Sequence, residues 1–171
     1  MAGAAAVLGA AAALCFLPFR DCLTVRGADG RTAAVLPLEG EGAFRIAFRH
    51  SVSREPWIEH YRKGPAGTIE LTGTAFKAYG AGIPTGDEGG TTVLRDGWIV
   101  IEGMKRDVPR IVQMVLPLTE HRIGIGGAEY DLVGILRGGT KAFLAIERKS
   151  VAAALLAEAR RPRLPRWTGT D

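Results

Sequence analysis

The chain has 171 residues, 47% of them hydrophobic and 23% charged, which is the composition of a folded globular protein rather than a disordered one. This length suits one ordinary domain and is too short for two. The formal net charge is +4, but basic and acidic side chains balance over residues 1–147, so the excess is confined to the C-terminal end. A nucleic-acid-binding domain carries its basic residues across the folded surface. We therefore expect no nucleic-acid partner.

The first twenty residues form an apolar segment. Ala2–Phe19 contains no charged side chain, and its 18 residues lie near the lower limit for a helix that spans a bilayer. No basic residue precedes the run, as one would in a normal signal peptide. We expect a helical membrane anchor over residues 1–20, with a cleaved signal peptide as the alternative. Arg20, Arg26 and Arg31 follow the segment and favour an inward-facing domain, so the topology stays open.

The two cysteines do not define a site. Cys15 lies inside the apolar segment and Cys22 just after it, so we expect neither a disulfide between them nor a metal site. Leu14 occupies the position before Cys15, where lipoprotein processing requires a small residue.

Residues 21–148 read as an all-β domain. Short β-prone runs are separated by Gly, Asp and Pro, and stretches of helical period are nearly absent. Asp29-Gly30 and Asp96-Gly97 each stand between two apolar runs, which is a strong hairpin signal. About ten short antiparallel strands of this kind form a single sandwich or a small barrel.

The expected strands follow from the apolar runs. One strand presents an inner face made of Phe44, Ile46, Phe48, His50 and Val52. The other runs are Leu23–Val25, Ala33–Leu38, Trp57–Arg62, Thr68–Ala78, Thr92–Leu94, Trp98–Ile101, Ile111–Leu116, His121–Ile125, Ala128–Leu132 and Lys141–Ile146. A glycine-rich connection, Gly80–Gly90, is either a functional loop or a plain one.

Residues 149–171 differ from the body of the chain. Val151–Ala159 is rich in alanine and predicts a short helix that Pro162 ends. Arginines follow in the tail, which is either a solvated end or a contact to anionic lipid.

Common catalytic signals are missing. The chain has no nucleophile elbow, phosphate loop, Cys-x-x-Cys or His-Glu-x-x-His pattern, so we expect no enzyme, no cofactor and no metal. Gly124-Ile125-Gly126-Gly127 lies between two β runs and predicts a hairpin rather than a nucleotide loop. Glu59 and His60 point to opposite faces of a strand and therefore cannot share one metal ion without a bulge.

The densest group of polar residues is Arg49–Tyr61, where one strand turns into the next. One interpretation is a structural corner, in which His50 and Ser51 bind buried backbone groups and Trp57 closes the end of the sandwich. The other is a pocket for a small solute or a partner loop, with convergent polar groups from His50, Ser51, Glu59 and Tyr79.

Several motifs in this order resemble the bacterial family known as domain of unknown function 1850. The matching pieces are Arg49-His50-Ser51-Val52, Glu59, Tyr79-Gly80-Ala81-Gly82-Ile83-Pro84, Gly97-Trp98, and Gly103-Met104 with Arg106. The resemblance covers roughly residues 22–148. The resemblance implies no known reaction. Members of this family tend to be encoded beside TAXI-type tripartite ATP-independent periplasmic (TRAP) transporters. The candidate ligand- or partner-binding residues are His50, Ser51, Glu59, Tyr79, Gly80, Gly82, Pro84, Trp98 and Arg106.

Three functions remain in view. The first is a membrane-associated or exported accessory protein, with its domain on the periplasmic side, that binds the permease, the solute-binding protein or the solute of a TRAP transporter. The second is a hydrolase-like enzyme in which His50 is the base and Glu59 orients it. The third is a structural module of the cell envelope without a pocket.

Overall fold

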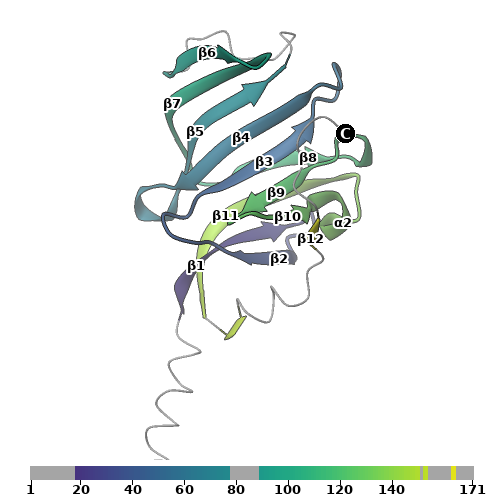
Figure 1. The fold of residues 1–171 in the computed structure, drawn as a ribbon. Helices are drawn as coiled ribbons and strands as arrows, with labels where there is room; N and C mark the ends of the chain where they lie inside the picture. The colour runs from purple at the N-terminus through teal and green to yellow at the C-terminus, as the bar shows by residue number, and fades with distance from the viewer. Residues whose placement is uncertain (1–17, 78–88, 151, 154–162, 165–171) are drawn as a thin grey trace, which may run out of the picture.

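The computed structural model describes residues 18–77, 89–150, 152–153 and 163–164 (Figure 1). Residues 1–17 of the predicted N-terminal helix, residues 80–88 of the Gly80–Gly90 connection, and all of the predicted helix Val151–Ala159 except the helical residues 152–153 therefore lie outside the described residues. Pro18 and Phe19, at the end of the expected anchor, already belong to the first strand. No helix within the described part of the chain is both long enough and apolar enough to cross a membrane.

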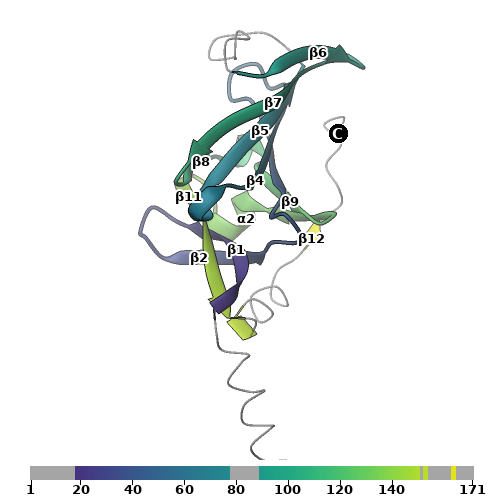
Figure 2. The ribbon, with the colours of Figure 1, turned by 90° about the vertical axis from the view of Figure 1, so that its left-hand side faces the viewer.

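Two antiparallel sheets make up the fold (Figures 1 and 2). The small sheet has the order β2-β1-β11-β8 and contains β1 (Pro18–Arg26), β2 (Thr32–Pro37), β8 (Ile111–Val115) and β11 (Thr140–Ser150). The large sheet has the order β12-β10-β9-β3-β4-β5-β7-β6. Its strands are β3 (Phe44–Arg49), β4 (Pro56–Lys63), β5 (Ile69–Phe76), β6 (Thr91–Arg95), β7 (Trp98–Val108), β9 (Arg122–Ile125), β10 (Ala128–Asp131) and β12 (Arg163–Leu164).

Helical structure is sparse among the described residues. One short helix, α2 (Leu132–Leu136), follows β10, and two 3₁₀ turns, η1 (Pro65–Gly67) and η2 (Pro117–Thr119), follow β4 and β8. The expectation of a mostly β fold is therefore confirmed. Of the two predicted architectures, the two-sheet sandwich is the one that the described strands form, since neither sheet closes into a barrel.

The main core lies between the two sheets. It joins side chains of the small sheet such as Leu23 and Leu144 to side chains of the large sheet such as Ile46 and Ile123. Burial of such side chains contributes about 1.5–3 kcal/mol each, which is what holds the layers together. A second cluster of Trp57, Phe76, Ile99, Ile101 and Met104 lies on β4, β5 and β7. In Figure 1 the large sheet extends beyond the small one, up to β6.

Local turn chemistry explains the hairpins. Asp96 and Gly97 between β6 and β7 have φ angles of 51° and 75°, and Gly126 and Gly127 between β9 and β10 have φ angles of 55° and 83°. Two successive residues with positive φ match the twist of a tight hairpin. Both turns confirm the sequence-based prediction.

The predicted strand through Phe44, Phe48, His50 and Val52 is wrong at its end. β3 stops at Arg49, and His50 begins a turn in which its carbonyl oxygen accepts a hydrogen bond from Arg54 N at 2.9 Å. Arg54 has a φ of 64°, which an extended strand does not permit. The alternation of the sequence continues past the strand, so Val52 is 82% exposed instead of lying on the inner face.

Candidate functional site

A cavity of about 200 Å³ lies where β3 of the large sheet ends beside β8 of the small sheet. The end of β3 and the turn after it provide Phe48, Arg49, His50 and Ser51. The other side of the cavity consists of Gln113, Met114, Leu116, Thr119 and His121, which belong to β8 and to the segment around η2. We call these nine residues the corner cavity.

His50 is fixed by its own turn. Its backbone N–H donates to the carbonyl oxygen of Glu55 at 2.9 Å, and its Nδ1 atom accepts the N–H groups of Val52 and Ser53, each at 3.4 Å. The imidazole also stacks on Trp57, with a centroid distance of 5.9 Å. The corner interpretation expected buried backbone groups, whereas the N–H groups that His50 binds belong to the exposed residues Val52 and Ser53. These contacts orient the ring beside the cavity.

A row of stacked rings forms the wall behind the cavity. The ring of His121 lies 4.8 Å from that of Phe48, Phe48 lies 6.1 Å from Trp57, and Trp57 lies 4.8 Å from Phe76. Aromatic pairs in this range contribute about 0.5–1.5 kcal/mol beyond the burial of their area. The indole Nε1 of Trp57 is buried and has no hydrogen-bond partner among the described residues. Apart from the imidazole of His121 and the indole nitrogen of Trp57, the row is apolar.

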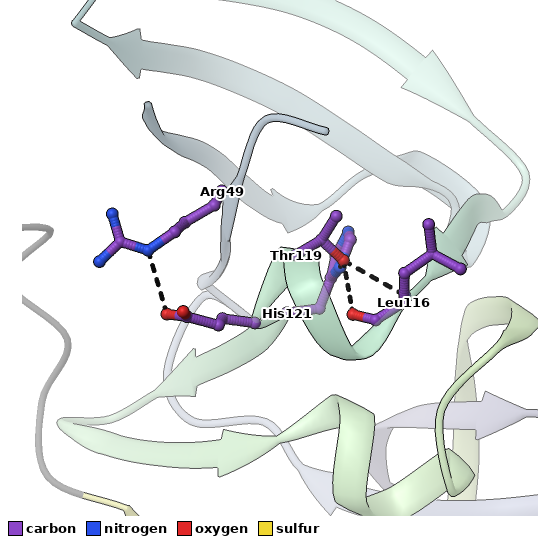
Figure 3. Close-up of polar contacts among 5 residues, drawn as sticks. Arg49, Leu116, Thr119 and His121 are labelled. Carbon is purple, nitrogen blue, oxygen red and sulfur yellow. Dashed lines mark hydrogen bonds and ion pairs between the residues drawn. The ribbon is translucent and has the colours of Figure 1, made fainter. Parts of the chain in front are cut away.

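Thr119 and His121 contribute polar groups to the cavity lining, and Figure 3 shows the Thr119 oxygen beside the backbone of Leu116. The Thr119 hydroxyl donates to the carbonyl oxygen of Leu116 at 2.8 Å and accepts the Leu116 N–H at 3.2 Å. Its oxygen also lies 2.7 Å from Nδ1 of His121. A hydroxyl has one proton to donate, and that of Thr119 is donated to the carbonyl oxygen of Leu116. We therefore assign the remaining contact as Nδ1–H of His121 donating to Thr119.

This assignment gives His121 a defined chemical state. Burial lowers the pKa of His121 to about 4, so the ring is neutral at physiological pH. With its proton on Nδ1, the neutral ring carries its lone pair on Nε2, for which no hydrogen-bond partner exists among the described residues. The ring of His121, which lines the cavity, thus carries a hydrogen-bond acceptor at Nε2.

Arg49 and Glu120 form an ion pair beside the cavity, with Nε and Oε2 3.2 Å apart (Figure 3). Glu120 has a φ of 48°, which reverses the chain after η2 and turns Glu120 towards the end of β3. The pair connects the two segments that line the cavity and places a guanidinium group at its edge.

Glu59 occupies a position between the sheets rather than in the cavity. It lies on β4 opposite Ile46 and accepts hydrogen bonds from the Tyr61 hydroxyl at 2.8 Å and from Nε2 of Gln113 at 3.2 Å. Burial raises the pKa of the Glu59 carboxyl, while the Tyr61 hydrogen bond and the charge of Arg106 oppose that rise. Gln113 also lines the cavity, so it connects Glu59 to the corner.

The structure brings together some of the predicted site residues and separates others. His50 and Ser51 line the corner cavity, and Glu59 with Arg106 lies behind it. Trp98 lies at the start of β7, below the ammonium group of Lys77 at 5.2 Å, and it alternates with the buried Ile99. It therefore belongs to the opposite face of the sheet. Tyr79, Gly80, Gly82 and Pro84 lie outside the described residues.

The alternation of β4 separates the polar side chains of Glu59 and His60. His60 lies on the face opposite Glu59, as the alternation predicted, and no group of three potential metal ligands exists within the described part of the chain. Neither Thr119 nor His121 was among the candidate site residues; His121 was expected only at the start of a strand. The single available signal was the Thr-x-His spacing after Pro117, which is too common to identify a site.

The comparison with known families decides the relationship of the chain. Residues 44–132, just over half of its length, match the family described as domain of unknown function (DUF1850). The chain belongs to the DUF1850 family. The matched part begins at the first residue of β3 and ends at the start of α2, so it contains every residue of the corner cavity. Strands β1, β2 and β11 of the small sheet lie outside it. No curated protein and no solved structure matches the chain significantly.

Proposed function

We propose that this DUF1850 protein is a membrane-associated or exported binding module that serves a TAXI-type TRAP transporter, and that the corner cavity is where it binds the permease or the solute-binding protein. The N-terminal apolar segment is the proposed anchor, and the domain lies on the periplasmic side. A partner protein is favoured over the solute itself by the size and the rim of the cavity.

The exposed apolar side chains around the cavity carry this proposal. Five large hydrophobic residues are exposed among the described residues; one of them, Met114, lines the corner cavity, and Val52 and Leu118 are next in sequence to lining residues. Val52 is 82% exposed and follows Ser51, Met114 lines the cavity and is 49% exposed, and Leu118 is 44% exposed in the same turn as Thr119. Exposed apolar groups that gather in one place, rather than singly, mark protein contact surfaces.

The dimensions of the cavity support the same conclusion. Pockets for drug-sized ligands measure about 300–1,000 Å³, whereas this one measures about 200 Å³. Such a space suits one side chain of a partner. The lone pair on His121 Nε2 would accept a hydrogen bond from that side chain, so a hydroxyl, amide or indole donor fits the cavity better than a purely apolar group.

The enzyme alternative is weaker on geometric grounds. His50 Nδ1 faces its own turn, Glu59 binds Tyr61 and Gln113, and no hydrogen bond connects His50 with Glu59 in the described structure. A base and the group that orients it need such contact. The structural-module alternative predicts no pocket, and the corner cavity argues against it.

Co-purification tests the proposal. The tagged full-length protein is isolated from solubilised native membranes, together with Val52→Glu, Leu118→Glu and the double variant. Leu94→Glu is the matched control, because Leu94 is 78% exposed on β6 and, unlike Val52 and Leu118, is not next in sequence to any residue of the cavity lining. We expect mass spectrometry to identify a TRAP permease or solute-binding protein with the wild type and with Leu94→Glu. The variants at the rim, Val52→Glu, Leu118→Glu and the double variant, should lose this TRAP component.

Two results would overturn the proposal. The first is that the folded wild type captures no TRAP component. The second is that Leu94→Glu loses the partner as fully as the rim variants do, because the cavity would then have no special part in the contact.

A further inference from the structure

A second concave surface lies on the other face of the large sheet. Its volume is about 550 Å³, within the range of small-molecule sites. Arg45 on β3 and His60 on β4 are paired residues that point away from the core, since they alternate with Phe44, Ile46 and Tyr61. We call this surface the outer groove; the residues that matter for its chemistry are Glu41, Arg45, His60, Arg62, Gly124 and Glu129.

A buried ion pair forms one wall of the groove. Glu129 on β10 is only 2% exposed, and its Oε1 atom accepts the Nε–H of Arg45 at 3.1 Å as well as a terminal guanidinium N–H. Gly124 lies between the two residues, opposite both in the sheet. A Cβ atom at Gly124 would lie 2.7 Å from Arg45 Nε and 3.0 Å from Glu129 Oε1. A glycine is therefore needed for the pair to lie flat across β9.

The second carboxylate oxygen of Glu129 has no hydrogen-bond partner within the described structure, although it is buried. A buried charged oxygen without a donor is costly, because it has lost its water without replacement. Native proteins complete such groups with an ordered water, an ion or another bound molecule, or keep them where strain or catalysis serves a function. Since Glu129 also lines the outer groove, the groove is where a donor would come from.

The charges around the groove define the kind of donor. Arg45 is neutralised by Glu129, and Arg62 pairs with Glu70, its NH2 group lying 2.6 Å from Oε1. Burial, and secondarily the charge of Arg45, lowers the pKa of His60, which keeps that ring neutral.

Two further acidic residues lie at the groove or next to it. Glu41 lines it, and the carboxylate of Glu39 lies against the Gly126 turn at its margin. Neither of these exposed residues has an ion pair in the described part of the chain. Arg45 and Arg62 are each paired with a carboxylate. Glu41 and Glu39 are therefore the charges at the groove left without a counter-ion among the described residues, and they favour a cation.

We propose that the outer groove binds a small organic cation through a primary ammonium group, which donates to the free oxygen of Glu129 while Glu41 stabilises its charge at the rim. An ammonium group is compact, carries three donors and no acceptor, and fits beside the Arg45 guanidinium that already occupies the other oxygen. This site lies on the outer face of the large sheet, opposite the hydrophobic core. It is independent of the proposed transporter contact at the corner cavity.

Calorimetric titration of the full-length protein in detergent tests this site. The probes are putrescine and n-butylamine, and the uncharged control is 1,4-butanediol. We expect saturable binding of at least one amine and none of the diol. Glu129→Gln should weaken amine binding about tenfold or more, since it removes the charge of the contacting group. The control variant Glu102→Gln removes one carboxylate from an exposed ion pair with Arg95 on β6 and β7, and it should bind as the wild type does.

A second variant keeps the test valid if Glu129→Gln does not fold. Glu39 and Glu41 are exposed, so the double variant Glu39→Gln/Glu41→Gln should fold normally and bind the amine severalfold more weakly. The site is refuted if neither amine binds the wild type. It is also refuted if the Glu129 or Glu39/Glu41 variants, once shown to be folded by circular dichroism, bind as tightly as Glu102→Gln.

Discussion

Nε2 of Gln113 on the small sheet donates to Oε2 of Glu59 on the large sheet across 3.2 Å, and the Tyr61 hydroxyl donates to the same oxygen at 2.8 Å. A carboxyl group thus lies in the space between two apolar layers. The contact crosses the core and reaches the corner cavity, since Gln113 also lines that cavity. The protonation state of Glu59 therefore affects both the stability of the sandwich and the position of one cavity residue.

Glu59 should make the protein less stable as the pH rises. Its pKa is raised in the folded state by burial, so folding favours the protonated form. The stabilising effect is complete below the unfolded pKa of about 4.5 and is lost as the pH rises through the folded value. Glu59→Gln cannot ionise, and we expect its unfolding free energy, measured with urea, to fall less between pH 4.5 and pH 8 than that of the wild type.

Glu59→Ala is the contrasting variant. It leaves the Tyr61 hydroxyl and the Gln113 amide without their acceptor and should cost about 1–3 kcal/mol at every pH. Equal pH dependence in the wild type and in Glu59→Gln would show that Glu59 keeps an ordinary pKa.

His121 should act in the opposite direction. Its pKa falls from 6.5 to about 4 on folding because the ring is buried, so the unfolded chain binds a proton that the folded one excludes. The contribution of His121 is complete above pH 6.5 and disappears as the pH falls towards 4, a difference of about 3 kcal/mol. We expect the unfolding free energy of His121→Gln, measured with urea, to fall less between pH 6.5 and pH 4 than that of the wild type. An NMR titration in which the ring of His121 protonates near pH 6.5 would contradict the expectation.

Local signals explain which parts of the fold could be predicted. The turn at Asp96-Gly97 depends on the φ angles of the turn residues themselves, which the sequence encodes directly. The end of β3 was misplaced because His50 and Val52 continue the alternation of the strand, although the chain reverses through Arg54. Alternation alone carries no information about where a strand stops.

The candidate sites required knowledge of pairing between distant segments. Glu129 meets Arg45 across 84 positions in sequence, and only the strand order β3-β9-β10 brings them together. Glu59 and Gln113 are 54 positions apart, in different sheets. The sequence marked the Arg49–Tyr61 region as polar, but it could not show that Thr119 and His121 complete the same cavity.

Gly124→Ala should destabilise the protein through the Arg45–Glu129 pair. The added methyl group would lie 2.7 Å from Arg45 Nε, so the guanidinium must shift, and overpacking of this kind costs about 1–3 kcal/mol. In an Arg45→Ala background the obstacle is absent. The same substitution should then cost markedly less, as a double-mutant cycle of urea unfolding free energies will show. Equal costs in both backgrounds would place the strain in the backbone of β9 instead.

Arg49→Ala should separate stability from partner binding. Arg49 pairs with the partly exposed Glu120, and ion pairs at the surface contribute less than about 1 kcal/mol. Arg95→Ala is the matched control, because Arg95 pairs with Glu102 at 3.1 Å on β6 and β7 and is absent from the cavity lining. Arg95→Ala should unfold within about 1 kcal/mol of the wild type, and Arg49→Ala within about 2 kcal/mol, because the Arg49 side chain is 19% exposed against 63% for Arg95 and also loses packing. Only Arg49→Ala should reduce recovery of the TRAP component in the co-purification, because it alone removes a guanidinium from the corner cavity. Equal recovery with the two variants would exclude Arg49 from the contact surface.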